Sequence, residues 1–193
     1  MKPVVGGRED ALRELARRLS YVPGDIVECG VWNGASLAAI TTGLPDRHVW
    51  AYDSFEGMPP IGPHDPPEAA EYVGRVVGSE AALRELLAGR RITELTVRAG
   101  WFKDTFKEEP LPERIAFLSI DCDWYSSVFD SLTTLYELVA PGGVVVLDDW
   151  GCWEGCRLAF YDWAEMTGEH PLLLTFGLGQ AYWVKGQEHV RNT

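Results

Sequence analysis

The strongest constraint on the fold is a set of short apolar runs separated by segments with helical periodicity. The runs are "DIVEC", "HVWAY", "RIAFLSI" and "VVVL", and stretches such as "SLAAITTGL" lie between them. Strand patterns that alternate with helix patterns favour a mainly parallel sheet with helices on both faces. We therefore predict an α/β fold whose ligand site lies beyond the carboxyl ends of the strands.

The two ends of the chain add further elements to this plan. Residues 9–19 have apolar positions at helical spacing and predict an N-terminal helix before Pro23. Helices are also expected at about 126–139, before a turn at Pro141, and at 154–166. "PLLLTFG" and "QAYWVK" predict a hairpin through "GLG", which would add an antiparallel strand at one edge.

The size of the chain is sufficient for one hydrophobic core. It has 193 residues, of which 46% are hydrophobic, so we expect a single domain over residues 1–193. Residues 1–24 would form the N-terminal helical segment. Residues 58–67 contain five prolines, which exclude a regular element. We interpret residues 57–78 as a lid over the site.

The net charge of the chain limits the classes of partner that it can bind. The net charge is −12, which opposes association with nucleic acid or with an anionic membrane surface. We expect no targeting segment and no membrane span, and hence a cytoplasmic protein. The cysteines lack the paired spacings of a disulfide framework or a zinc site, so we expect reduced, packed thiols. They are Cys29, Cys122, Cys152 and Cys156.

A glycine-bearing turn follows the first strand in "VECGVWNGAS". Gly30 and Gly34 would let the backbone approach a ligand, and the helix beginning near Asn33 would direct amide groups at it. The turn lacks the full G-x-G-x-x-G pattern, and an ordinary tight turn is an equal alternative. Asp53 ends the second strand at the spacing expected for an acid that binds ribose. It could instead cap a turn with Ser54.

The third strand ends in "GWFKDT". Trp101 and Phe102 could border a planar base by stacking, or they could pack at the edge of the core. The sequence does not separate these alternatives.

Acids gather at the ends of the fourth and fifth strands, in "SIDCD" and "VVVLDDW". Neighbouring parallel strands would bring Asp121, Asp148 and Asp149 together, where mutual repulsion favours a hard divalent cation. We infer magnesium, although solvated acids that cap the following helices are an alternative. Asp123 is either a further ligand or a residue that orients substrate or cofactor.

Taken together, these motifs resemble the macrocin O-methyltransferase family of sugar methyltransferases in antibiotic biosynthesis. "ECGVWNGAS", "DSFEGMP", "GWFKDT", "IDCDWYSS", "LYELVAPGGVVVLDDWG" and "YWVK" follow the family's order over residues 25–185. Cys122 departs from the glycine of the family's D-G-D stretch and leaves both acids in place. The family's members carry a longer N-terminal part.

The resemblance implies the class I methyltransferase fold, which is Rossmann-like with a mostly parallel seven-stranded sheet. It implies S-adenosylmethionine as methyl donor, Mg²⁺, a hydroxylated small-molecule acceptor such as a sugar or glycoside, and a homodimer. The metal ligands would be Asp121, Asp148 and Asp149. The cofactor-binding positions would be Glu28, Gly30, Trp32, Gly34, Ser36, Asp53, Ser54, Trp101, Phe102 and Asp121.

Methyl transfer to oxygen requires a base as well as an aligned hydroxyl. Asp121 is one candidate, and His64 on the lid is the other, although His64 could simply be an exposed loop residue. Two other functions remain open from the residues themselves. "DCD" is also typical of the D-x-D motif of metal-dependent glycosyltransferases, and a cofactor-binding scaffold without turnover is the non-catalytic alternative.

Overall fold

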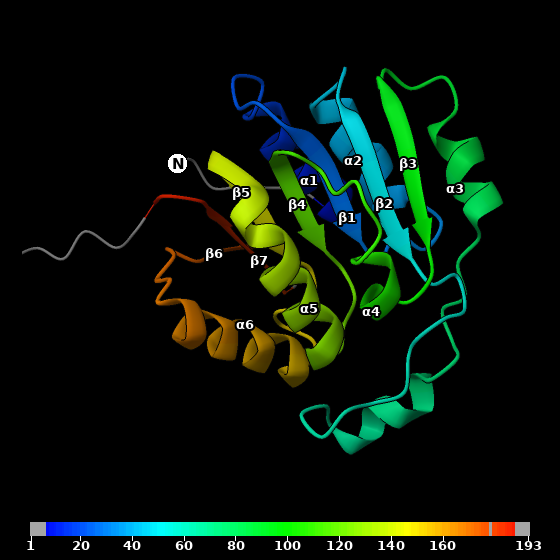
Figure 1. The fold of residues 1–193 in the computed structure, drawn as a ribbon, viewed down its shortest axis with the longest axis vertical. Helices are drawn as coiled ribbons and strands as arrows, with labels where there is room; N and C mark the ends of the chain where they lie inside the picture. Colours follow the sequence, from blue (N-terminus) through cyan, green and yellow to red (C-terminus); the bar gives the residue numbers. More distant parts are fainter. Residues whose placement is uncertain (1–6, 178, 188–193) are drawn as a thin grey trace, which may run out of the picture.

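The protein, described by a computed structural model over residues 7–177 and 179–187, is built around one seven-stranded sheet (Figure 1). The strands lie in the order β3-β2-β1-β4-β5-β7-β6. Their bounds are β1 Asp25–Cys29, β2 His48–Asp53, β3 Glu94–Ala99, β4 Ile115–Ile120, β5 Val139–Leu147, β6 Leu174–Phe176 and β7 Gln180–Val184. The chain order reverses direction between β1 and β4, which is the switch point of such a sheet.

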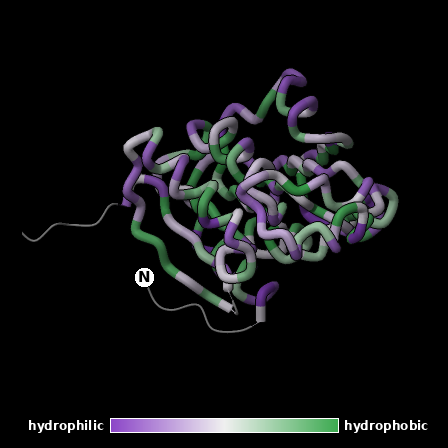
Figure 2. The backbone as a smooth tube through the Cα atoms, turned by 90° about the horizontal axis from the view of Figure 1, so that it is seen from below, coloured by the Kyte–Doolittle hydropathy of each residue, from purple (hydrophilic) through white to green (hydrophobic). Residues whose placement is uncertain are grey.

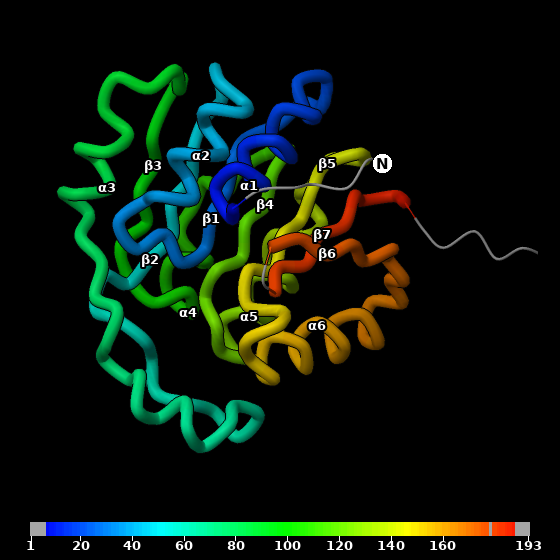
Figure 3. The backbone as a smooth tube through the Cα atoms, turned by 180° about the vertical axis from the view of Figure 1, so that it is seen from behind, coloured from blue at the N-terminus to red at the C-terminus, as the bar shows by residue number. Residues whose placement is uncertain are grey.

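Helices connect the strands. The α-helices are α1 Arg8–Arg17, α2 Ala35–Gly43, α3 Glu80–Leu87, α4 Phe102–Thr105, α5 Tyr125–Leu135 and α6 Glu154–Thr167, and the 3-10 helices are η1 Pro67–Tyr72 and η2 Tyr136–Leu138. Helices α5 and α6 cover the face turned to the viewer in Figure 1. Helices α1 and α2 cover the opposite face, which Figure 3 turns forward.

The two faces of the sheet bury separate apolar layers. Side chains of α1 and α2 pack with Ile26 and Val49 on one face, while side chains of α5 and α6 pack with Val27 and Leu118 on the other. The hydropathy colouring in Figure 2 places hydrophobic stretches mostly inside the molecule. Because both faces of the sheet are buried, the parallel strands carry apolar side chains on both sides rather than alternating apolar and polar residues.

The parallel pairs are β1 with β2, β1 with β4, β2 with β3, and β4 with β5. Strand β7 runs antiparallel to β5 and to β6, which confirms the predicted C-terminal hairpin. Residue 178 of its turn lies outside the described residues. Among the described residues, no helix combines the length and apolar character needed to cross a bilayer.

The sequence prediction is wrong at the start of β5. The helix expected to reach about residue 139 is found, because η2 continues α5 to Leu138, but a turn was expected at Pro141. Instead β5 begins at Val139, which pairs with Ile115. The next pair joins Val144 to Phe117, so the glycine-rich segment forms a bulge inside β5. Pairing with a buried strand outweighs the local preference for a turn.

The cysteines are free, and three of them are buried. The exception is Cys152, which is exposed although packed thiols were expected. It lies in the turn that precedes α6, where the backbone passes over the surface.

The segment predicted to be a lid, residues 57–78, lies beyond the carboxyl ends of the strands (Figure 1). It contacts the start of α5 through two hydrogen bonds. The indole of Trp124 donates to the carbonyl oxygen of Pro59 at 3.0 Å, and the Tyr125 amide donates to Asp65 Oδ1 at 2.8 Å. Asp65 is buried and accepts a second bond from the Gly62 amide. The lid is therefore anchored at the start of α5.

Candidate active site

The site is built from the carboxyl ends of four adjacent parallel strands. Backbone hydrogen bonds continue past these ends, because the Gly30 amide donates to the Tyr52 carbonyl and the Asp121 amide to the Cys29 carbonyl, both at 2.8 Å. The Asp148 amide likewise donates to Ile120 at 3.0 Å. The residues that follow each strand are consequently held in register with one another.

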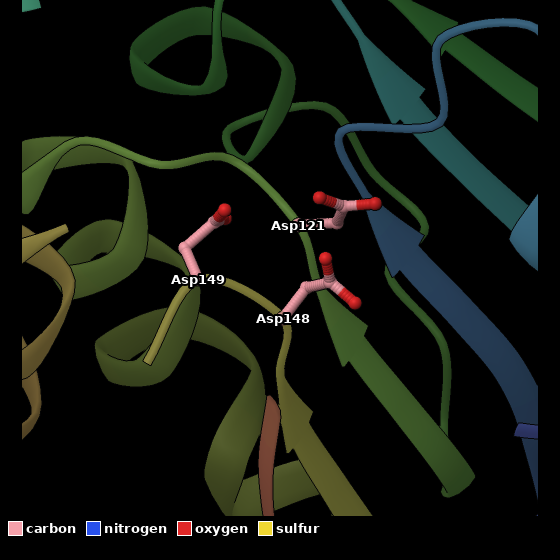
Figure 4. A group of neighbouring side chains, drawn as sticks. All are labelled: Asp121, Asp148 and Asp149. Atoms are coloured by element: carbon pink, nitrogen blue, oxygen red, sulfur yellow. The ribbon is translucent and has the colours of Figure 1, made fainter. Parts of the chain in front are cut away.

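Three carboxylates converge at this edge (Figure 4). Asp121 follows β4, and Asp148 and Asp149 follow β5. Each offers a ligand oxygen, and these oxygens lie within 4.8 Å of one another. The structure thus places the three acids in the group that the sequence predicted.

Asp123 differs from the other acids because it contacts the group through its backbone amide. Its backbone φ is +57°, an unusual value for a residue with a side chain, and its amide donates to Asp149 Oδ2 at 3.0 Å. The bond fixes the orientation of the Asp149 carboxylate. Asp123 therefore supports the group of three through its backbone.

A cation from the other end of the chain also contacts the acids. Arg8, the first residue of α1, forms ion pairs with Asp121 and with Asp148, and its Nε lies 2.7 Å from Asp148 Oδ1. No motif in the sequence pointed to Arg8, because its two partners lie 113 and 140 positions away. We call Asp121, Asp148 and Asp149 the acidic cluster, and Arg8 is the arginine that pairs with it.

Burial and crowding disturb the titration of these acids. Burial raises the pKa of Asp121 well above its ordinary value, the neighbouring Asp148 adds to the rise, and Arg8 opposes it. Burial likewise raises the pKa of Asp149, with the charges of Asp123 and Asp121 adding to it. Burial and the neighbouring carboxylates thus both oppose the ionisation of these acids.

Glu28 of β1 is a second unusual acid. Its side chain is fully buried, and neither carboxylate oxygen has a hydrogen-bond partner of good geometry. Burial raises its pKa to about 7, against the opposing influence of the nearby Ser36 and Ser119 hydroxyls and of Arg8. A buried acceptor of this kind is costly unless a ligand or proton satisfies it.

The glycine turn after β1 is required by packing. A Cβ on Gly30, whose φ is +85°, would lie 1.8 Å from the Asp121 carbonyl oxygen. Gly34 precedes α2 with a φ of +87°, so the helix begins at Ala35 rather than near Asn33. Trp32 between them has a φ of +47° and is half exposed. The turn presents strained backbone at the site, a feature often found where ligands bind.

Asp53 joins the glycine turn to the turn after β2. Its Oδ2 accepts from the Trp32 amide at 2.8 Å, and its Oδ1 accepts from the Phe55 amide at 2.7 Å. Ser54 Oγ accepts from the Glu56 amide at 3.1 Å. The turn-capping alternative is therefore realised in the structure. Each Asp53 oxygen retains a further lone pair for a ligand hydroxyl.

The two aromatic residues after β3, Trp101 and Phe102, occupy different positions at the start of α4. Trp101 caps α4, whereas Phe102 is its first residue and stacks on Phe106 with ring centroids 5.0 Å apart. Phe102 packs against the apolar layer under α5 and α6. Its packing matches the core alternative considered from the sequence.

His64, the other candidate base, lies on the lid. Its side chain is exposed, and its ring stacks on that of Tyr125 with centroids 4.2 Å apart. It is not among the residues that the structure groups as candidate metal ligands.

Comparison with known proteins assigns the chain to a family. The model of the macrocin O-methyltransferase (TylF) family matches residues 5–185. The chain belongs to this family. It is 33% identical over 189 residues to mycinamicin III 3''-O-methyltransferase of Micromonospora griseorubida, covering 91% of this chain and 71% of that protein.

Two further similarities agree with membership of the macrocin O-methyltransferase family. A tetracenomycin-C 4'-O-methyltransferase of Streptomyces olivaceus, named for a dimethoxyrhamnosyl substrate, is 36% identical over 161 residues, 76% of this chain and 60% of that protein. The structure of the O-methyltransferase NovP superposes with a TM-score of 0.80 at 29% identity, covering 93% of this chain and 80% of that one. The chain is thus shorter than these relatives.

A more distant structure shows the fold alone. An O-methyltransferase from Bacillus cereus, solved with SAH, has a TM-score of 0.58 at 16% identity, covering 95% of this chain and 83% of that one. The predicted class I methyltransferase fold and the predicted enzyme class, an O-methyltransferase, are confirmed.

The donor set of the acidic cluster fits a hard divalent cation. It consists of three carboxylates with oxygens close enough to share one ion, and their mutual repulsion, which Arg8 only partly offsets, favours a divalent cation. The unpartnered oxygens of Glu28 likewise fit a cofactor that brings hydrogen-bond donors.

Proposed function

We propose that this macrocin O-methyltransferase family member transfers the methyl group of S-adenosylmethionine to a hydroxyl of a sugar or another polyol-bearing small molecule, with Mg²⁺, in natural-product biosynthesis. One observation carries the proposal: three carboxylates from the ends of β4 and β5 meet beside the glycine turn of β1. The names of the relatives support a glycosidic acceptor.

The cofactor would lie across the ends of β1 and β2. We assign the methionine part to Glu28, Gly30 and Gly34, with Trp32 and Ser36 beside them. Asp53 would accept from the ribose hydroxyls, Ser54 would accept from or donate to them, and Trp101 with Phe102 would border the adenine. S-adenosylmethionine, when bound, supplies the electrophilic methyl group.

The acidic cluster would hold the metal and position the acceptor. Asp121, Asp148 and Asp149 are the proposed ligands, and Asp123 holds Asp149 in place through its amide. Magnesium, when bound, supplies positive charge that lowers the pKa of vicinal acceptor hydroxyls. The lid would exclude water from the hydroxyl and the methyl group.

Two residues are proposed as the base. Asp121 lies in the cluster, next to the position where the acceptor hydroxyl would bind. His64 would have to leave its stacked position on Tyr125 to reach the same hydroxyl. Turnover of His64→Ala at the parent rate would exclude His64 and leave Asp121.

A calorimetric titration tests the proposed function. S-adenosylmethionine is titrated into metal-free protein, and the titration is repeated with Mg²⁺ and with Asp148→Asn. We expect cofactor binding in the parent and a magnesium signal that Asp148→Asn abolishes. Glu85→Gln, which removes the same charge from an exposed position on α3, is the matched control. Absence of cofactor binding in every sample would refute the proposal.

Turnover separates the remaining alternatives. Sugar acceptors are screened by mass spectrometry for the gain of one methyl group. Competition by S-adenosylhomocysteine supports methyl transfer, whereas competition by a uridine-diphosphate sugar would support the glycosyltransferase. Cofactor binding without metal dependence or product would support the non-catalytic scaffold.

The remaining assignments complete this proposal. We infer a single domain over residues 1–193, a cytoplasmic location and a small-molecule partner, with no nucleic acid or membrane partner. A homodimer is expected from the family. Sedimentation velocity tests it, and a single species of monomer mass at all concentrations would exclude it.

A further inference from the structure

Arg8 occupies a particular place in the acidic cluster. It contacts Asp121 and Asp148, which the proposed function assigns as metal ligands from two different strands. One guanidinium bridges the two carboxylates, with Nε on Asp148 Oδ1 and Nη2 on Asp121 Oδ2. The carboxylates of Asp121 and Asp148 lie next to each other in Figure 4. A cation that took these two oxygens as ligands would compete with Arg8 for them.

The formal charges show that Arg8 does not fully replace a divalent ion. Asp121, Asp148 and Asp149 bring three negative charges, and Asp123 and the buried Glu28 lie close by. Arg8 brings one positive charge to them. Asp149 is held by the Asp123 amide. A divalent cation would compensate more of the cluster's charge than Arg8 does.

The position of Arg8 allows it to leave the cluster without unfolding its helix. Arg8 is the first residue of α1, and Gly7 before it provides no side-chain cap. The helix is held farther along by the buried side chains of Ala11, Leu12 and Leu15. About a third of the Arg8 side chain is exposed, at 32%. A rotamer change of Arg8 would therefore leave the packing of α1 intact.

We propose that Arg8 is a displaceable internal counter-ion of the acidic cluster, which holds Asp121 and Asp148 together without metal and must withdraw when a divalent cation binds both. The inference rests on the proposed metal site. It assigns to the N-terminal helix a control over metal affinity.

The size of the effect follows from competition for one site. A ligand that binds only the open form has its apparent affinity reduced by the fraction of molecules that are open. If Arg8 holds the cluster in about nine molecules of ten, the apparent affinity is about tenfold below that of the open site.

The test measures divalent-cation affinity without cofactor or acceptor. Mg²⁺ and Mn²⁺ are titrated calorimetrically into the parent, Arg8→Gln and Arg8→Lys. We expect Arg8→Gln to bind about tenfold more tightly, and Arg8→Lys to fall between it and the parent. Arg13→Gln is the matched control, because Arg13 lies on the same helix and pairs with Asp10 away from the cluster. Its affinity should equal that of the parent.

A second measurement uses the unaltered protein, in case Arg8→Gln folds poorly. In arginine labelled with ¹⁵N, the Arg8 Nε–H that donates to Asp148 should be protected from exchange without metal and lose this protection with Mg²⁺. Protection of this Nε–H that persists at saturating Mg²⁺ would overturn the proposal that Arg8 is displaced.

The remaining outcomes distinguish this inference from the metal site itself. Equal or weaker cation binding by Arg8→Gln, with binding intact in the parent, would overturn the counter-ion alone. Failure of both proteins to bind a divalent cation would overturn the metal site and the counter-ion together.

Discussion

Among single residues, Glu28 links stability most directly to the proposed function. Its carboxylate is fully buried without a hydrogen-bond partner of good geometry, and its pKa rises from 4.5 to about 7. Between these values the folded protein holds a proton that the unfolded chain releases. The free energy of unfolding therefore falls as pH rises through this window and then levels off.

Replacement of Glu28 by Gln should remove part of this pH dependence. We expect the parent to lose on the order of 1–3 kcal/mol of unfolding free energy between about pH 4.5 and 7, and Glu28→Gln to lose less. At about pH 8 the variant should be the more stable protein, yet bind S-adenosylmethionine more weakly. Urea unfolding at several pH values measures the first effect. Parallel pH curves for both proteins would contradict it.

The glycines of the site give a second prediction at the scale of the residue. Gly30→Ala places a Cβ against the Asp121 carbonyl, so it should destabilise the fold by more than about 2 kcal/mol. Gly89→Ala is the control, because its φ of +76° imposes similar backbone strain with nothing within 4 Å of the added Cβ. It should cost only about 1 kcal/mol. Equal losses in urea unfolding would show that strain alone matters at Gly30.

The lid depends on Asp65 for one of its two hydrogen bonds to the start of α5. Asp65 accepts from the first amide of α5 and from the Gly62 amide within the lid, and it is almost completely buried. Loss of its carboxylate would leave the Tyr125 amide without that acceptor and weaken the attachment of the lid to the helix. The start of α5 and the lid are thus stabilised by one side chain.

Asp65→Ala should therefore make the lid susceptible to limited proteolysis and raise the KM for the acceptor. The cost in unfolding free energy should be about 1–3 kcal/mol, since buried donors are left unsatisfied. Glu68→Ala, an exposed position in η1, is the control and should behave like the parent. Cleavage at the same rate in both variants would mean that Asp65 does not anchor the lid.

Elements with strong local signals were predictable from the sequence, and those set by distant contacts were not. The apolar run of β4 and the helix α6 stand where their periodicity placed them. The bulge in β5 was missed because it arises from pairing with β4. Asp121, Asp148 and Asp149 were found because parallel strands bring their ends together. Arg8 was missed because nothing near it in the sequence marks an ion pair with Asp148.

At the scale of the whole molecule, three of the acids that give the chain its net charge of −12 meet at the site, where a cation would stabilise them. A ligand that binds only the folded state raises the free energy of unfolding by about 2.7 kcal/mol at 100 times its dissociation constant. We expect Mg²⁺ to raise the melting temperature of the parent accordingly. Asp148→Asn should show no such rise. Sodium chloride at equal ionic strength controls for screening, and an equal rise with sodium would exclude a specific site.

The strand order β3-β2-β1-β4-β5-β7-β6 also bears on how the chain folds. The acids of the site come from the ends of β4 and β5, and β4 is held in the sheet by β1, whose Asp25 pairs with Ile115 across a long stretch of chain. Contacts of such sequence separation form late, because long loops must close first. Cation binding should accordingly develop late in refolding, after the local helices. A stopped-flow signal from the bound ion would then report completion of the sheet. The rate of cation binding during refolding would therefore measure the rate of this last folding step.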